Sequence, residues 1–186
     1  MDNQRSQSQM MRIGTVASVD AAAATCRVST GEITTGDIPW CVPGAGSFSV
    51  WSCPRVGEQV VLLCPEGDLE GALVLRGLYS TAHPAPRNRL DTTLIRFPDG
   101  AELEYDEAAH TLNATLPSGG SATLTADAGV TINGPFTVNG DTTLNGDTHV
   151  SQTLTADTDV VGGGKSLKGH KHVGVQTGSG QTGAPA

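Results

Sequence analysis

The sequence predicts an all-β protein made of two different regions, a small N-terminal barrel followed by a long segment of extended chain. No stretch carries the apolar spacing of a long amphipathic helix. Short runs of Val, Ile and Leu in the first half are separated by Gly, Pro and Asp turn signals. The composition then changes, because six of the seven aromatic residues lie in the first 105 positions, and residues 97–164 contain ten acidic residues but no Lys or Arg.

The first region, residues 12–90, is expected to fold as a barrel of the OB type. About eighty residues in five or six short strands fit such a barrel better than a sandwich, which usually has more strands. Residues 1–11 are expected to form a flexible N-terminal segment. The expected strands are residues 12–19, 25–30, 36–42, 48–52, 58–64 and 72–79.

The charge of the chain excludes several classes of function. The chain has 11 Lys and Arg against 19 Asp and Glu, a formal net charge of −8. An acidic chain without a basic run lacks the electrostatic footprint of a protein that binds nucleic acid or an anionic membrane. No apolar stretch approaches the roughly 20 residues of a membrane helix, and the polar N-terminus lacks the apolar stretch of a secretion signal.

The aromatic and cysteine residues of the barrel are best interpreted as structural. Trp40, Phe48 and Trp51 could stack on bases, but the basic residues around them are scattered, which favours core or subunit-contact roles. The cysteines show none of the close pairs of a zinc site and are expected to be reduced, small core residues. They are Cys26, Cys41, Cys53 and Cys64.

The second region shows a strict alternation. Because side chains alternate faces along a strand, a period of two buries one face and exposes the other to water. Here the phase persists for about fifty residues across several Gly-containing turns, whereas a meander resets it at each loop. The even-numbered apolar residues are Leu112, Ala114, Leu116, Ala122, Leu124, Ala126, Ala128, Val130, Ile132, Phe136, Val138, Leu144, Val150, Leu154, Ala156 and Val160.

A six-residue repeat lies within this alternation. An aliphatic residue followed by Asn-Gly recurs at residues 132–134, 138–140 and 144–146. Fixed short periods are typical of β-solenoids and fibres, in which each turn covers only its neighbours. We expect each Asn-Gly to supply the positive φ of a tight bend.

The second region has too little apolar material to fold alone. At about 25 cal/mol per Å² of buried area, one aliphatic residue in six does not offset roughly 1–2 kcal/mol of backbone entropy per residue. Three chains wound about one axis would share a thin core and pair every strand edge. We therefore predict an intertwined homotrimer, a triple-stranded β-helix over residues 91–160.

A metal site is predicted near the C-terminus, at His170 and His172. In an extended segment residues i and i+2 point the same way, so both imidazoles share a face. Three copies would present six nitrogens, which suits octahedral coordination of a first-row metal such as iron. His83, His110 and His149 lack such pairing and are expected to be structural or solvated.

Several motifs together resemble the central spike, or baseplate assembly protein V, of contractile-tailed phages and R-type pyocins. Residues 54–62 and 71–80 are similar to its OB domain, and residues 97–106 are similar to the start of its spike. His170 and His172, with the Gly174-Val175 and Thr182-Gly183-x-Pro185 segments that follow, are similar to its apex. The resemblance covers nearly the whole chain from about residue 12.

This resemblance implies a trimeric OB collar, a needle and, over residues 161–186, an apex in which six histidines hold one iron ion per trimer. It also allows calcium or chloride inside the needle, without residues to place them. It implies a non-enzymatic spike that pierces the target cell's outer membrane when the sheath contracts. The spike would be assembled in the producing cell's cytoplasm, sit at the tail baseplate tip, and contact hub and tail-tube proteins through its N-terminal domain.

Two other classes fit part of the sequence. Hexapeptide-repeat acyltransferases also trimerise, but only four or five hexads are present here and their turns would not keep the even-odd partition. A trimeric tail fibre or adhesin would carry a terminal recognition head with exposed aromatics, whereas no aromatic residue follows Phe136.

Overall fold

The structure, a computed structural model, describes residues 10–171, 173–174 and 178 of the chain. These residues form β-strands and one 3-10 turn, η1 (Pro65–Gly67), so the all-β prediction is confirmed. The chain divides into two compact units, Met1–Leu124 and Thr125–Ala186, which are described separately. The flexible segment predicted for residues 1–11 lies outside the described residues except at its last two positions, and the first strand begins at Met11.

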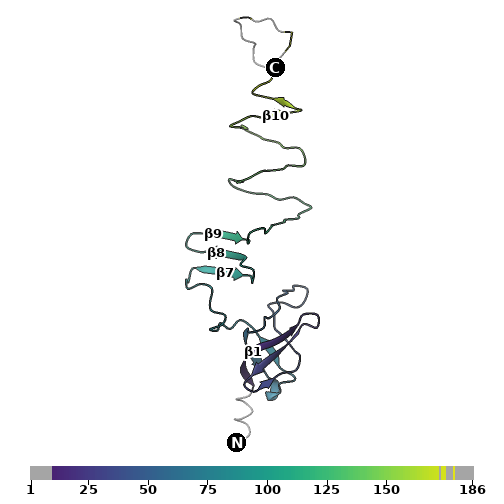
Figure 1. Cartoon of the computed structure of the whole chain (residues 1–186), viewed down its shortest axis with the longest axis vertical. Coiled ribbons are helices and arrows are strands. Elements are labelled where there is room, and N and C mark those ends of the chain that lie inside the picture. Colours follow the sequence, from purple (N-terminus) through teal and green to yellow (C-terminus); the bar gives the residue numbers. More distant parts are fainter. Residues whose placement is uncertain (1–9, 172, 175–177, 179–186) are drawn as a thin grey trace. The chain divides into compact units, whose positions relative to one another are not determined.

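The N-terminal sheet closes into a barrel (Figure 1). Its strands pair in the order β3-β2-β1-β5-β6, and β4 also pairs with β2. Trp40, directly after β4, forms a bridge to Val74 in β6, and the Cys41 N–H donates to the Val74 carbonyl at 2.8 Å, which joins the two ends of the sheet. The strands are β1 (Met11–Asp20), β2 (Thr25–Thr30), β3 (Ile33–Thr34), β4 (Ile38–Pro39), β5 (Gln59–Leu63) and β6 (Leu73–Leu75).

The barrel encloses the hydrophobic core of the described chain. Alternate residues of the strands point inward, as in β5, where Val60 and Leu62 are fully buried and the residues between and beside them are partly buried. Of the four cysteines predicted to be core residues, Cys26 and Cys64 belong to this core, and desolvation raises the pKa of both buried thiols. The prediction was wrong for Cys41, which is exposed, and for Cys53, which is only partly buried, because both lie outside the strands of the barrel. The core residues are Val16, Cys26, Val28, Ile38, Val60, Leu62, Cys64, Ala72 and Val74.

The prediction of a strand at residues 48–52 was wrong. This segment is a loop with one isolated bridge, Ala45 to Ser49, closed by a hydrogen bond from the Val50 N–H to the Gly44 carbonyl at 2.9 Å. Its apolar residues do not enter the core, because Phe48 and Trp51 are exposed. An apolar run therefore signalled a surface loop here. The short strand β3 was not predicted.

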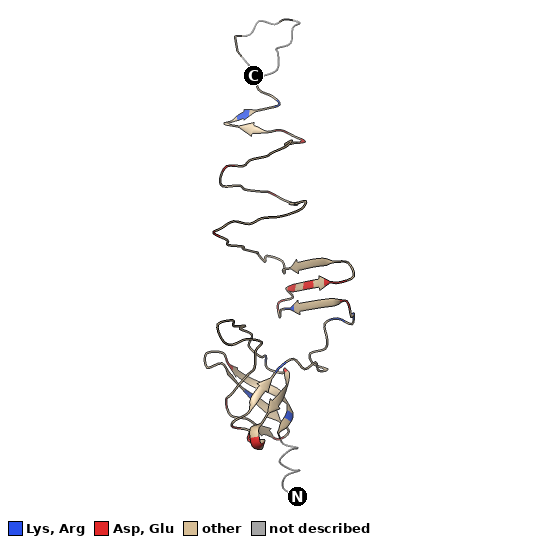
Figure 2. Cartoon of the chain, turned by 180° about the vertical axis from the view of Figure 1, so that it is seen from behind, with Lys and Arg blue, Asp and Glu red and all other residues tan. Residues whose placement is uncertain are grey.

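A three-stranded antiparallel sheet follows the barrel within the first unit. It consists of β7 (Thr92–Arg96), β8 (Glu102–Asp106) and β9 (Thr111–Thr115). The acidic residues of β8 (red in Figure 2) form ion pairs with three arginines. The distance is 2.6 Å between Arg96 and Glu102 and 2.7 Å between Arg87 and Glu104.

The opposite face of this sheet is apolar and partly exposed. The register places Tyr105 opposite Leu112 and Leu103 opposite Ala114. The apolar side chains on this face are therefore odd-numbered in β7 and β8 and even-numbered in β9, whereas Leu94 of β7 lies opposite Glu104 on the charged face. The change of parity occurs in the turn between β8 and β9, where His110 has a φ of 53°. The even-numbered apolar residues that follow begin on this face.

Beyond β9 the chain is extended but forms few hydrogen bonds with itself. The structure assigns no strand from residue 116 to residue 160, and every residue from 107 to 158 is exposed. The chain of residues 125–160 runs back and forth without arrows in Figure 1. Gly134, Gly140 and Gly146 have φ values of 144°, 149° and 154°, so the positive φ predicted for the Asn-Gly repeats is confirmed.

Candidate metal centre

The segment that carries His170 begins with a two-stranded hairpin. Strands β10 (Val161–Gly162) and β11 (Lys165–Ser166) pair antiparallel, with Gly162 opposite Lys165. The two residues between them, Gly163 and Gly164, have φ values of 56° and 76°. A two-residue hairpin turn with positive φ at both positions strongly favours glycine, so the Gly-Gly sequence determines where the chain reverses.

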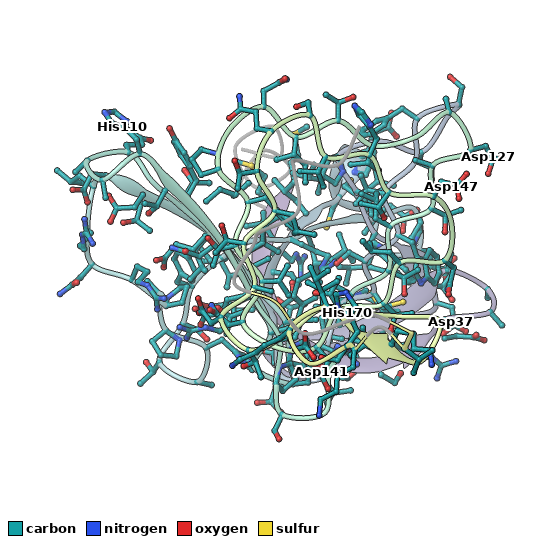
Figure 3. The ribbon with its side chains drawn as sticks, turned by 90° about the horizontal axis from the view of Figure 1, so that it is seen from above. Asp37, His110, Asp127, Asp141, Asp147 and His170 are labelled. Atoms are coloured by element: carbon teal, nitrogen blue, oxygen red, sulfur yellow. The ribbon has the colours of Figure 1, made fainter. Side chains whose placement is uncertain are left out.

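A single turn then leads from β11 to His170. The His170 N–H donates to the Ser166 carbonyl at 3.0 Å, and the Gly169 N–H donates to Ser166 Oγ at 2.7 Å. The Leu167 N–H donates to the Val160 carbonyl at 2.8 Å, which extends the pairing of the hairpin by one residue on each strand. Figure 3 shows His170 close to the arrow of this hairpin. The backbone position of His170 is therefore defined by local hydrogen bonds.

The side chain of His170 is oriented by the backbone. Its Nδ1 lies 2.9 Å from the Leu167 carbonyl oxygen. Since a carbonyl oxygen only accepts, Nδ1 must carry the hydrogen, and in the neutral ring the lone pair is then on Nε2. Histidines that bind metals commonly donate their other ring N–H in this way. The tautomer of His170 therefore fits a metal ligand.

The described residues of one chain do not supply enough ligands for a metal site. They contain no group of three or more His, Cys, Asp or Glu side chains that could hold a metal ion. His172, the second predicted ligand, lies outside the described residues, so its role stays a prediction. A site at His170 therefore needs ligands from His172 or from other copies of the chain.

The other histidines lie away from this segment in the sequence. His110 occupies the β8–β9 turn, His149 is exposed, and the His83 N–H donates to Ser80 Oγ at 3.1 Å. Only His170 occurs in the hairpin and turn of residues 160–171.

The hairpin segment also depends on a residue that the sequence reasoning missed. Asp159 directly precedes it, and its Oδ1 accepts the Val160 N–H at 2.8 Å and the Lys168 N–H at 3.0 Å. Hydrogen bonds from Ser166 and from the Lys168 N–H lower the pKa of Asp159, so its carboxylate is ionised at neutral pH. The only sequence signal is an Asp placed before a glycine hairpin, which is too common to single out.

An open pocket of about 850 Å³ lies against the same turn. Its lining combines the apolar residues Val160 and Leu167 and three glycines with four polar residues. The polar residues are Lys165, Ser166, His170 and Lys171, so the predicted ligand His170 faces an open space.

Comparisons with known proteins identify the class of the chain. Residues 12–79 match the family described as the type VI secretion system/phage-baseplate injector OB domain. Residues 166–186 match the GpV apex motif, which includes the turn with His170. An OB barrel at one end of the chain and an apex motif at the other define a component of a baseplate injector.

The family follows from a relative that matches along almost the whole chain. The sequence is 35% identical over 201 residues to the spike protein of Escherichia phage P2, covering 97% of this chain and 94% of that protein. The chain belongs to the family of baseplate spike proteins of contractile phage tails. It is a structural component of the virion tail baseplate, where it associates with other baseplate components, and its family is not one of enzymes.

These findings confirm the predicted family, the OB barrel and the spike function. They also decide against the alternatives of an acyltransferase and of an adhesin. Among the described residues, no helix has the length and apolar character needed to cross a membrane.

Proposed function

We propose that three copies of this chain form a needle capped by one metal ion, and that this needle pierces the outer membrane of the target cell when the sheath contracts. One observation carries the proposal. All apolar side chains in the segment of residues 116–160 are exposed, including Leu124 at 76%, Phe136 at 70% and Leu144 at 67%. A surface row of this length in a soluble protein is expected to be covered by a partner.

Identical chains are the simplest cover for this row. The apolar residues recur at even positions from Leu112 to Val160, so a copy in the same register offers the same row at every level. The extended backbone over residues 116–159 has no strand partner among the residues that the structure describes. Pairing with two other copies would satisfy the backbone groups and leave no open edge. A trimeric β-helix meets both needs together.

The metal cap is supported by the donor chemistry of the terminal segment. With Nδ1 bonded to the Leu167 carbonyl, His170 can offer Nε2 to a metal. His172 follows two positions later, so three chains would supply six imidazoles, a number suited to octahedral coordination. When bound, the metal would cross-link the three chain ends. The resemblance to the spike family favours iron, and calcium or chloride inside the needle stays a prediction without assigned residues.

The mechanism is mechanical. The OB barrel, as a collar over residues 12–90, would attach the needle to hub and tail-tube proteins. The shaft over residues 91–160 would transmit the force, and the apex over residues 161–186 would concentrate it at the tip. Hydrogen bonds between chains in the shaft would resist shear along the needle. Assembly would precede release from the producing cell, in its cytoplasm, and action would follow at the target envelope.

Native mass spectrometry with metal analysis tests this proposal on the full-length protein. We expect a mass of three chains plus one metal ion. Replacing both histidines, as His170→Ala with His172→Ala, should remove the metal and leave three chains. The matched control His149→Ala should retain the metal. A compact, well-ordered single chain in solution would overturn both the needle and its cap.

A further inference from the structure

We propose that Asp159 is a positioning residue for the apical metal, acting on His170 through the peptide group between Leu167 and Lys168. This inference rests on the metal cap proposed above. It assigns a function to a carboxylate outside the His-x-His motif. The evidence is a continuous hydrogen-bonded path from the Asp159 carboxylate to the imidazole ring.

The path passes through one peptide unit. The N–H of this unit, from Lys168, donates to Asp159 Oδ1 at 3.0 Å. Its C=O, from Leu167, accepts from His170 Nδ1 at 2.9 Å. The peptide is trans, so its N–H and C=O point in opposite directions and the carboxylate and the imidazole bind opposite sides. The order is carboxylate, peptide, imidazole.

The charge of Asp159 strengthens the second bond of this path. An ionised acceptor makes a stronger hydrogen bond to the peptide N–H than a neutral one does. It also polarises the peptide, which makes the Leu167 oxygen a better acceptor for the ring N–H. A stronger bond at Nδ1 fixes the ring orientation and raises the basicity of Nε2, the nitrogen that would bind the metal. In many metal sites a carboxylate contacts the metal-binding histidine directly, and here the peptide lies between the two groups.

The same carboxylate also organises the backbone around the turn. Asp159 Oδ1 accepts the Val160 N–H as well, so it ties the start of the hairpin to its far end, nine residues later. Ser166 contributes a hydrogen bond to this carboxylate, while its Oγ accepts the Gly169 N–H. The peptide that orients His170 is therefore held by a carboxylate that Ser166 holds in turn. Loss of Asp159 removes one end of the path without altering His170.

A chelator experiment on the full-length assembled protein tests the proposal. The protein is stripped of metal, reloaded with Co²⁺, whose visible spectrum reports the ligand field, and mixed with excess chelator. Asp159→Ala should bind Co²⁺ about 10–100-fold more weakly than the unmodified protein, the usual loss of affinity for a missing outer-shell partner, and should release it correspondingly faster to the chelator. Asp159→Asn keeps an oxygen acceptor but not the charge and should be intermediate. Asp157→Ala is the matched control, because Asp157 is exposed and makes no hydrogen bond among the described residues.

The outcomes separate this inference from the metal cap itself. If both Asp159 variants release Co²⁺ at the unmodified rate with an unchanged spectrum, the role of Asp159 is overturned and the cap stands. If His170→Ala binds Co²⁺ as tightly as the unmodified protein, the cap fails and the role of Asp159 with it. If Asp159→Ala does not assemble, the nearly isosteric Asp159→Asn decides. A lower melting temperature without faster Co²⁺ release would show a purely structural role and contradict the proposal.

Discussion

The barrel and the extended segment of residues 116–160 obtain their stability in opposite ways. The barrel buries nine residues of its own chain in one core. In the extended segment, by contrast, all residues but Asp159 are exposed. Both segments have alternating apolar residues, so alternation alone does not make an independent fold. What differs is whether the chain brings a second apolar face against the first.

The sheet of β7, β8 and β9 lies between these extremes. It has regular pairing within the chain, as the barrel does, but its apolar face is partly exposed, with Ile95 at 54% and Leu112 at 69%. Its charged face is closed by arginine ion pairs. The share of each region's apolar side chains that is buried within its own chain therefore decreases from the barrel through this sheet to the extended segment. The comparison predicts that core substitutions in the barrel affect one chain, whereas substitutions of even-numbered residues affect assembly.

The largest effect is expected for Leu144→Asp. An unpaired carboxylate in a shared core costs about 3–5 kcal/mol, and three copies would meet at one level of the needle. We therefore expect the trimer to be lost, as measured by analytical ultracentrifugation. The barrel should remain folded, because its core residues come from its own chain.

The neighbouring residue provides the control for this substitution. Thr143 has the opposite parity, so Thr143→Asp places the same charge on the solvent face and should leave the trimer intact. Equal behaviour of the two variants would contradict the assignment of even-numbered residues to a shared core.

Leu62→Ala should have the next largest effect, confined to the barrel. Leu62 is fully buried among the strands, and removing such a side chain lowers the free energy of unfolding by about 2–5 kcal/mol. Tryptophan fluorescence during denaturant unfolding measures this, because both tryptophans, Trp40 and Trp51, lie in the barrel domain. Leu73→Ala, on the exposed side of β6, should change stability by about 0.5 kcal/mol or less. Dissociation of the trimer by Leu62→Ala at low denaturant would contradict the separation of the two regions.

Gly140→Ala tests the repeat that distinguishes the extended segment. At a φ of 149° an L-residue is strained, and such strain costs about 1–3 kcal/mol per chain. Apart from Gly140 and its two chain neighbours, no described residue has an atom within 4 Å of the added methyl group, so the backbone is the expected cause. We expect a lower melting temperature of the assembly by calorimetry. Gly162→Ala, at a glycine without positive φ, should have a smaller effect, and the reverse order would contradict this explanation.

The barrel strands were predicted where local pattern and tertiary pairing agree. The segment of residues 25–30 was predicted with the bounds of β2, because its alternation is flanked by turns on both sides. The segment of residues 48–52 was not a strand, because Phe48 and Trp51 are apolar by composition but lie in a loop. Sequence alone did not distinguish an apolar strand from an apolar surface loop.

For the terminal site, the sequence predicted the two histidines but not the hydrogen-bonded path through Asp159. Spacing singled out His170 and His172, because two residues along an extended chain are enough to align two side chains. The path through Asp159 joins residues nine and eleven positions apart, and it depends on how the glycine hairpin folds back. Such geometry follows from tertiary hydrogen bonds and leaves no periodic signal in the sequence. In the proposed cap, the identity of the metal would depend on ligands from several chains, which one sequence does not specify.

The smallest expected effect concerns pH and the charged face of the intermediate sheet. The pKa of Glu102 is lowered, first by its hydrogen bond from Arg96 and then by that from Arg87. A carboxyl group with a lower pKa in the folded state stabilises the fold above its unfolded pKa. This contribution is lost as the pH falls through the folded pKa. Carboxyl ¹³C NMR titration should therefore show Glu102 titrating below the ordinary range of glutamate.

Substitution of each arginine in turn identifies the cause. Arg96→Gln should raise the pKa of Glu102 more than Arg87→Gln does, because the Arg96 bond makes the larger contribution. The melting temperature of Arg96→Gln should lie below that of the unmodified protein at neutral pH. The difference should vanish once Glu102 is protonated in both proteins, since the ion pair then no longer exists. A difference that persists in acid would mean that Arg96 stabilises the sheet by packing its aliphatic stem instead of by its charge.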